Sequence, residues 1–202
     1  MTSEVEICNI ALANIRSQAI NSLNERSLQA QQCKLFYPLL RDQLFEDVAW
    51  QFAHKVKSLS LLTLESFEYK YVYAYPSDCL KINKLLLNYQ QGRDVFGASE
   101  KVEYEIQNID DTKVIVSDHP DLRIDYRAKI KDPNLFTTQF VMTLAHLLAS
   151  EIAVPIVGAE MGRSLRSDSF QIYQRYLNAA IASNSNERHI RTPESEFITV
   201  RR

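Results

Sequence analysis

The sequence predicts a mixed α+β protein: a four-helix bundle with an inserted antiparallel β-region and an extended C-terminal arm. Near both ends of the chain, apolar residues recur at the three- and four-residue intervals of a helix that buries one face. In several segments between residues 67 and 130 they recur at every second position, as in half-buried strands. The final segment is too polar to form a core of its own. We therefore expect four parts: N-terminal helices in 1–58, the β-region in 59–131, closing helices in 132–182 and the arm in 183–202.

A first helix is expected to begin after Ser3. Ser3 and Glu6 have the spacing of a capping box, in which each side chain accepts a hydrogen bond from an amide left free at the helix start. The apolar residues that follow form one stripe, which is predicted to be buried: Val5, Cys8, Leu12 and Ile15.

A second helix is expected to begin after Ser27, which has the residue type of an N-cap. Pro38 lies inside this helix and removes one backbone hydrogen bond, so we expect a kink or a short break there. Its predicted core face contains Cys33, Phe36, Leu40, Leu44 and Val48.

Two residue pairs near the end of the second helix are candidates for specific roles. We interpret Trp50 and Phe52 as core anchors at the junction of helix and β-region, rather than as a platform for a ligand. Arg41 and Asp42 would form either a salt bridge between subunits or part of a solvated helix face. An exposed ion pair contributes only about 0 to 1 kcal/mol, so this pair carries little weight.

A strand with one aromatic face is predicted from Phe67 to Tyr75, where aromatic residues occupy alternate positions. Tyrosine combines a large apolar area with a polar tip, so Tyr69 and Tyr71 are candidates for a subunit interface. Tyr73 and Tyr75 lie next to a predicted turn, and we expect helices of the same subunit to cover them.

Further strands are expected at 80–87, 102–106, 114–116 and 122–130, with turns at 76–78 and 108–111. In the last strand the apolar residues face one way and the charged residues the other, which is typical of a half-buried antiparallel sheet. The neighbouring Asp110 and Asp111 are interpreted as turn residues, because adjacent carboxylates rarely share a substrate.

Two helices are expected to complete the bundle. Asp132 and Pro133 favour a helix start, with Asp as the N-cap and Pro at the first helical position, and the helix should end near Pro155 and Gly158. Its predicted core stripe contains Phe136, Phe140, Leu144 and Leu147. A last helix should run from about Gly162 to Ala182, with Phe170, Tyr173, Leu177 and Ile181 facing inward.

Composition argues against several classes of protein. The 202 residues carry a formal net charge of −2, so no net positive field draws the chain to DNA or to an anionic membrane. Only 4 glycines are present, without the spacing of a phosphate-binding or dinucleotide-binding loop, so no cofactor is expected. The apolar runs are too short to cross a membrane, and the acidic N-terminus does not resemble a secretory signal.

The cysteines and histidines do not predict a metal or a catalytic site. Three scattered cysteines, expected to be buried thiols, form no paired motif: Cys8, Cys33 and Cys79. The histidines likewise lack the spacing of metal ligands: His54, His119, His146 and His189. His146, Ser150 and Glu151 fall on adjacent turns of one helix, but such neighbours cannot adopt the geometry of a catalytic triad.

Several short blocks occur in an order that is more informative than any block alone. They include Cys8-Asn9-Ile10-Ala11-Leu12-Ala13, the bridge from Ile20 to Cys33, Arg41-Asp42, and the helix exit Trp50-Gln51-Phe52-Ala53. Later blocks are Tyr73-Ala74-Tyr75-Pro76-Ser77-Asp78-Cys79-Leu80 and Asp132-Pro133-Asn134-Leu135-Phe136. Together they resemble the tail tubular protein A family, the head-to-tail adaptors of short-tailed bacteriophages, over about residues 2–187.

The resemblance implies a structural role without catalysis. The family member would form a ring, expected to be a dodecamer, between the portal protein of the capsid and the nozzle or tubular protein B of the tail. Genomic DNA would pass through the lumen without sequence-specific binding. The protein would reside in the tail or neck of the virion after assembly in the host cytoplasm, with no membrane partner.

Two other functions remain open at this point. A tail-associated cell-wall hydrolase would need two separated acids in a cleft, which no motif identifies. A free-standing soluble interaction domain would be a stable monomer with no affinity for a portal ring.

The end of the chain is a candidate docking arm. It either packs on its own domain or adds a strand or plug to the portal or to a neighbouring subunit. Its residues are Phe197, Ile198, Thr199, Val200, Arg201 and Arg202.

Deletion of residues 197–202 tests the arm. If the arm docks on the portal or on a neighbour, the shortened monomer stays folded by circular dichroism but assembles more weakly in sedimentation or electron microscopy. Loss of the folded signal would contradict this expectation and place these residues in the core of their own domain.

Overall fold

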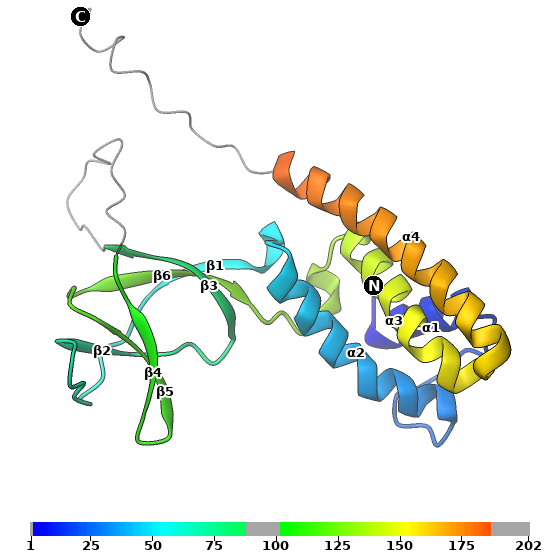
Figure 1. Ribbon diagram of the computed structural model, residues 1–202, viewed down its shortest axis with the longest axis horizontal. Coiled ribbons are helices and arrows are strands. Elements are labelled where there is room, and N and C mark those ends of the chain that lie inside the picture. Colours follow the sequence, from blue (N-terminus) through cyan, green and yellow to red (C-terminus); the bar gives the residue numbers. More distant parts are fainter. Residues whose placement is uncertain (1, 88–101, 187–202) are drawn as a thin grey trace, which may run out of the picture. The chain divides into compact units, whose positions relative to one another are not determined.

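The computed structural model describes residues 2–87 and 102–186, and it is a mixed α+β structure made of two compact units (Figure 1). The helical unit contains the chain up to Ala53 and again from Lys129. The sheet unit contains His54–Ala128, whereas the sequence suggested 59–131 for the β-region. The proposed arm, including residues 197–202, lies outside the described residues.

Helix α1 (Glu4–Asn14) begins with the expected capping box. The Ser3 amide donates to the Glu6 carboxylate (2.8 Å), and the Glu6 amide donates to the Ser3 hydroxyl (3.1 Å). The buried face contains Ile7, Cys8, Ala11 and Leu12. Within this helix, the Asn9 side chain accepts a hydrogen bond from the Ile20 amide (2.8 Å) and donates one to the Ile20 carbonyl (2.9 Å), which fixes the connection to the next helix.

Helix α2 (Leu28–Asp47) begins at the expected cap, where the Ala30 amide donates to the Ser27 hydroxyl (3.3 Å). The helix continues through Pro38 without a break. Cys33 is buried and its thiol shares a hydrogen bond with Cys8 of α1. This hydrogen bond and burial raise the pKa of Cys8, whereas the same hydrogen bond lowers the pKa of Cys33. All three cysteines are buried and free, as expected.

Helix α3 (Thr138–Val157) begins later than predicted. Asp132 caps only the short 3-10 helix η2 (Pro133–Leu135), and Thr137 caps α3 through a bond from the Phe140 amide (3.3 Å). The expected start at Asp132 is wrong because Phe136 has an extended backbone, with ψ of 137°, which separates the two helical segments. The end is as predicted: Gly158 is the C-cap, with φ of 91°.

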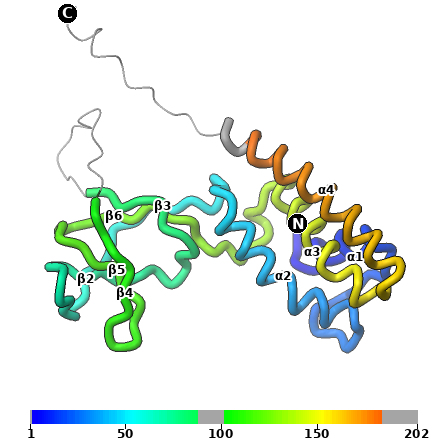
Figure 2. The backbone as a smooth tube through the Cα atoms, viewed as in Figure 1, coloured from blue at the N-terminus to red at the C-terminus, as the bar shows by residue number. Residues whose placement is uncertain are grey.

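Helix α4 (Ala159–Asn186) follows a tight turn and packs along α3 (Figure 2). The predicted inward stripe is partly wrong: Tyr173 is buried, but Phe170 and Ile181 are 43% and 41% exposed. The buried positions carry small side chains instead: Gly162, Ser169 and Ala180. Because the turn brings the two backbones close together, the face with small residues turns inward and the larger residues turn outward.

Among the described residues, α3 alone is long and apolar enough to cross a membrane by length and composition, with a mean hydropathy of 1.8 over its most apolar window. From the sequence we expect no apolar run long enough to cross a membrane. Helix α3 differs from that expectation because its few polar residues divide a long apolar helix into shorter runs. Two thirds of the window (67%) is buried inside the structure. Helices α1, α2 and α4 all contact α3, which is therefore the central helix of its unit.

The sheet unit contains two antiparallel sheets (Figure 1). Sheet A has the order β1-β6-β3, with β1 (His54–Ser58), β3 (Cys79–Leu87) and β6 (Leu122–Ala128). Sheet B has the order β2-β5-β4, with β2 (Tyr71–Ala74), β4 (Glu105–Ile109) and β5 (Thr112–Ser117). Central β6 buries Leu122, Ile124, Tyr126 and Ala128, and sheet B has a small core of Val72, Val114 and Val116.

Three expectations for the strands need correction. The tyrosine-rich strand is shorter than predicted, since only Tyr71–Ala74 pairs within sheet B and Phe67 is fully exposed. Strand β1 was not predicted, because every residue in it is exposed and no apolar alternation marks it. The charged face of β6 is not wholly solvated: Asp125 is only 5% exposed. The turn at Asp110 and Asp111 is confirmed, with φ of 49° and 58°.

Gly162→Ala tests the close contact of α3 and α4. A Cβ at this position would lie 2.8 Å from the Val154 Cα and 3.0 Å from the Ala153 carbonyl oxygen. Alanine favours a helix by about 1 kcal/mol over glycine, but overpacking costs about 1 to 3 kcal/mol. We expect the free energy of unfolding in urea to fall by about 1 kcal/mol or more. Exposed Ser164→Ala is the control and should be neutral or slightly stabilising; stabilisation by Gly162→Ala would show that the helices can separate without cost.

Candidate interaction surfaces

Arg41 and Asp42 belong to an ion network inside the helical unit. The Arg41 guanidinium donates to Asp42 Oδ1 through Nε (3.0 Å) and Nη2 (2.8 Å), and its Nη1 lies 3.7 Å from Glu4 of α1. Asp42 also pairs with Lys129, where the chain returns from the sheet unit. Because the Arg41 side chain is only 5% exposed, its interpretation as part of a solvated helix face is wrong.

Trp50 and Phe52 lie in a cluster of five aromatic rings. Trp50 is buried, and its indole N–H donates to the Leu44 carbonyl (2.8 Å). Phe52 is half-buried, and its ring centroid is 5.3 Å from that of Phe140. Phe45 and Phe136 complete the cluster, with centroids 4.8 Å from Phe140 in each case. The structure therefore places both residues among other side chains of the helical unit.

The four tyrosines of the predicted aromatic face have different environments. Tyr69 and Tyr71 are half-buried, and Tyr69 packs on the core of sheet B. Tyr73 is buried, and its hydroxyl donates to the His119 carbonyl (2.7 Å). Tyr75 has the Lys113 ammonium 3.9 Å from its ring centroid. Tyr69 and Tyr71, the two candidates for a subunit interface, thus each keep part of their surface exposed to solvent.

The side chains that could suggest catalysis have structural partners. His146 Nδ1 lies 3.2 Å from the Asn14 amide nitrogen, and the imidazole stacks on Tyr176. Burial lowers the pKa of His146, which keeps the ring neutral near pH 7. The Ser150 hydroxyl donates to the Leu147 carbonyl of its own helix (2.7 Å), and Glu151 faces Arg166 (3.6 Å). The three residues thus form no nucleophile–base pair.

Two other histidines are placed and one is not. His54 Nε2 lies 2.7 Å from Asp125, and the His119 carbonyl binds Tyr73. His189 lies outside the described residues. Within residues 2–87 and 102–186, no group of three or more His, Cys, Asp or Glu side chains could hold a metal ion.

Helix α2 exposes an apolar stripe, which we call the α2 stripe. Its members are Leu28, Leu35 and Leu39, which are 45%, 56% and 61% exposed. The spacings of seven and four residues place all three on one face of the helix. The inward face of the same helix carries a second set of apolar residues, so α2 is apolar on two sides.

Helix α4 exposes a second stripe, the α4 stripe, made of Phe170, Leu177 and Ile181. Phe170 and Ile181 are exposed and Leu177 is half-buried. Spacings of seven and four residues again place them on one face. Helix α3 lies between α2 and α4 (Figure 1), so the two stripes belong to different sides of the helical unit. Sequence periodicity assigns all three residues of the α4 stripe to the core, because it cannot show which of two apolar faces is covered.

Among known proteins, no family model matches the chain and no curated protein is significantly similar to it.

Arg41→Ala tests whether the ion network stabilises the isolated chain. Removal of the buried guanidinium opens a cavity and takes from Glu4 and Asp42 the cation that they share, although Asp42 keeps Lys129. The free energy of unfolding should therefore fall by about 2 kcal/mol or more. Urea denaturation of the monomer measures this change, with exposed Arg163→Ala as the control, expected within about 0.5 kcal/mol of the wild type. An unchanged monomer would show that Arg41 acts only between subunits.

Proposed function

We propose that this protein is a structural head-to-tail adaptor of a short-tailed bacteriophage. Copies of the chain would form a ring, expected to be a dodecamer, between the portal protein and the nozzle or tubular protein B of the tail. Genomic DNA would pass through the lumen. The four helices would act as one bundle that carries the sheets as an insertion, and residues 183–202 would dock on the portal or on a neighbouring subunit.

The pair of exposed apolar stripes is the observation that carries the proposal. Monomeric proteins rarely expose large contiguous apolar patches, and such patches usually mark interaction sites. Here Leu35 and Leu39 on α2, and Phe170 on α4, each expose more than 40% of their surface. Contact between two such stripes would remove them from water, which contributes about 25 cal/mol for each Å² of apolar surface buried.

The arrangement of the stripes favours a ring over a symmetric dimer. In a two-fold dimer the same surface patch meets itself, whereas in a ring one patch of each subunit meets a different patch of the next. The helical unit has two different patches, the α2 stripe and the α4 stripe, on different sides of α3. The α2 stripe of one subunit can therefore contact the α4 stripe of its neighbour, and repetition of this contact gives a ring when the rotation from one subunit to the next closes.

The residue blocks that resemble the adaptor family lie where the helical unit is held together. Arg41 and Asp42 join α1, α2 and the returning chain, and Trp50 and Phe52 join α2 to α3. A subunit that contacts neighbours on two sides needs such links between its helices to keep its shape. This position gives a physical reason for the blocks that does not involve catalysis.

Electron microscopy of the protein mixed with its candidate portal ring tests the proposal. The wild type should add a ring of density below the portal. Leu35→Glu and Phe170→Glu should each stay folded and monomeric but reduce ring occupancy at least tenfold, because a charge would be buried in the contact. A matched control on α4, exposed Gln171→Glu, carries the same charge away from the α4 stripe and should assemble normally.

The alternatives give different results in the same experiment. Wild-type monomers that ignore the portal would contradict the adaptor function for that partner and favour a free-standing domain. A cleared band in a peptidoglycan zymogram would favour a hydrolase. Normal assembly of Leu35→Glu and Phe170→Glu would be consistent with the adaptor function but would exclude the two stripes as the contact between subunits.

A further inference from the structure

Cationic side chains are concentrated in sheet A, although the whole chain has a formal charge of −2. The three strands of this sheet contain one acidic residue, Asp125, and six basic ones: Lys55, Lys57, Lys81, Lys84, Arg123 and Arg127. Acidic residues of the same unit lie in sheet B and its connections, among them Glu105, Asp110, Asp111 and Asp118. The low net charge therefore hides a separation of charge within the sheet unit.

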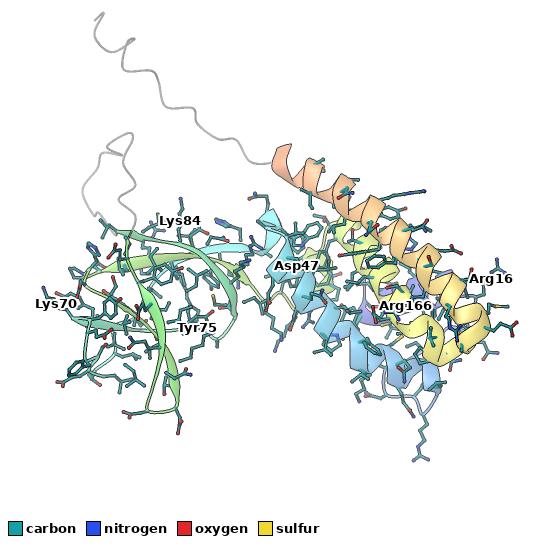
Figure 3. The ribbon with its side chains drawn as sticks, viewed as in Figure 1. Arg16, Asp47, Lys70, Tyr75, Lys84 and Arg166 are labelled. Carbon is teal, nitrogen blue, oxygen red and sulfur yellow. The ribbon has the colours of Figure 1, made fainter. Side chains whose placement is uncertain are left out.

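Strand pairing places most of this positive charge on one face. In β6, Ile124 and Tyr126 point into the core, so Arg123, Asp125 and Arg127 lie on the opposite face. Paired residues share a face, and Arg127 pairs with Lys81 while Asp125 pairs with Lys84. We call this the basic face of sheet A: Lys81, Lys84, Arg123 and Arg127, with His54 at its edge. Figure 3 labels Lys84 on β3.

The single carboxylate on the basic face is covered. Asp125 is only 5% exposed and lies 2.7 Å from His54 Nε2, and it accepts a hydrogen bond from the Asn83 amide (2.8 Å). The Asn83 carbonyl in turn accepts from Arg127 Nε (3.3 Å). Asp125 is thus occupied in holding the strands together and is not available to neutralise the outer cations.

Three of the cations point their charge to solvent. Lys81, Lys84 and Arg123 are exposed, and none of them forms an ion pair with another residue of 2–87 or 102–186. By contrast, Lys55 pairs with Asp78 (2.8 Å) near the edge of the sheet. Uncompensated cations on a flat strand face attract a partner that carries regularly spaced negative charge.

We infer that the basic face of sheet A binds the phosphate backbone of duplex DNA without regard to sequence. Arg123 and Arg127 are four residues apart, which is roughly 13 Å along a strand. Duplex DNA carries one phosphate charge for about every 1.7 Å of axis, so the face spans several phosphates. Lysine and arginine at this spacing contact phosphates, and three strands side by side are too wide to enter a groove that admits one helix or a two-stranded ribbon.

The absence of aromatic side chains selects duplex over single-stranded DNA. Proteins that bind single strands stack the unpaired bases on aromatic rings. In the strands of sheet A, Tyr126 is the sole Phe, Tyr or Trp, and it is buried on the opposite face. The basic face therefore offers charge to a backbone but no platform for bases.

Fluorescence anisotropy of a short labelled duplex of mixed sequence tests the inference on the full-length monomer. The wild type should bind at low salt, and the logarithm of its association constant should fall with the logarithm of salt concentration with a slope of about −3 to −4, for four phosphate contacts. Lys84→Gln combined with Arg123→Gln should weaken binding at least fivefold and flatten the slope by about 2.

A control of equal charge separates the basic face from a general charge effect. Lys34→Gln combined with Lys70→Gln removes two exposed cations outside sheet A and should leave affinity and slope unchanged. Equal weakening by both double variants, no binding by the wild type at low salt, or tighter binding to a single strand would each overturn the inference. Stronger binding to vesicles of anionic lipid than to DNA would overturn the inference and show that the basic face binds a membrane surface.

If the protein is an adaptor, the basic face would contact the DNA that passes through the lumen of the ring, and this part of the inference rests on the proposed function. DNA binding by sheet A itself does not rest on it. The adaptor function and DNA binding can therefore be refuted separately. A ring that assembles on the portal from a chain without DNA affinity would overturn this inference alone. Salt-dependent DNA binding by a chain that ignores the portal would overturn the adaptor function and leave the basic face standing.

Discussion

The contact among five aromatic rings holds together two parts of the chain that the sheet unit separates in sequence. Phe45, Trp50 and Phe52 come before the sheets, and Phe136 and Phe140 come after them. Removal of one such ring from a core costs roughly 3 to 5 kcal/mol, so the cluster is a large part of what makes the helical unit one body. The ion pair of Asp42 and Lys129 adds a second link at the point where the chain returns. These links therefore join α2 and its exit to α3 and to the returning chain.

The central position of α3 also decides which surfaces remain for partners. Helices α1, α2 and α4 cover it, and each has only one face in that contact. In α4 the contact requires small side chains, so Gly162 and Ala180 face inward and Phe170 is left outside. The exposed stripes are therefore a consequence of how the core is packed. An apolar face without a partner in the same chain is the form that a subunit contact takes before assembly.

Local signals in the sequence predicted local features well. The caps at Ser3 and Ser27, the turn at Asp110 and the helix end at Gly158 all depend on the chemistry of a few neighbouring residues. Features that depend on distant contacts were not predictable in this way. Strand β1 has no apolar alternation because all its residues are exposed, and only pairing with β6 makes it a strand. Arg41 is buried because Glu4, Asp42 and Lys129 meet around it in space. Composition does not reveal the basic face, because the net charge sums over the whole chain.

The discontinuity of the helical unit has a consequence for synthesis on the ribosome. Helices α1 and α2 are complete by Asp47, but their main partner α3 begins only at Thr138. At the usual speed of translation the delay is of the order of ten seconds, during which the apolar faces of both helices have no native partner. The sheets, whose strands lie within His54–Ala128, can form in the meantime. Because α3 is synthesised after every strand of the two sheets, the helical unit can be completed only after the sheet unit has been synthesised.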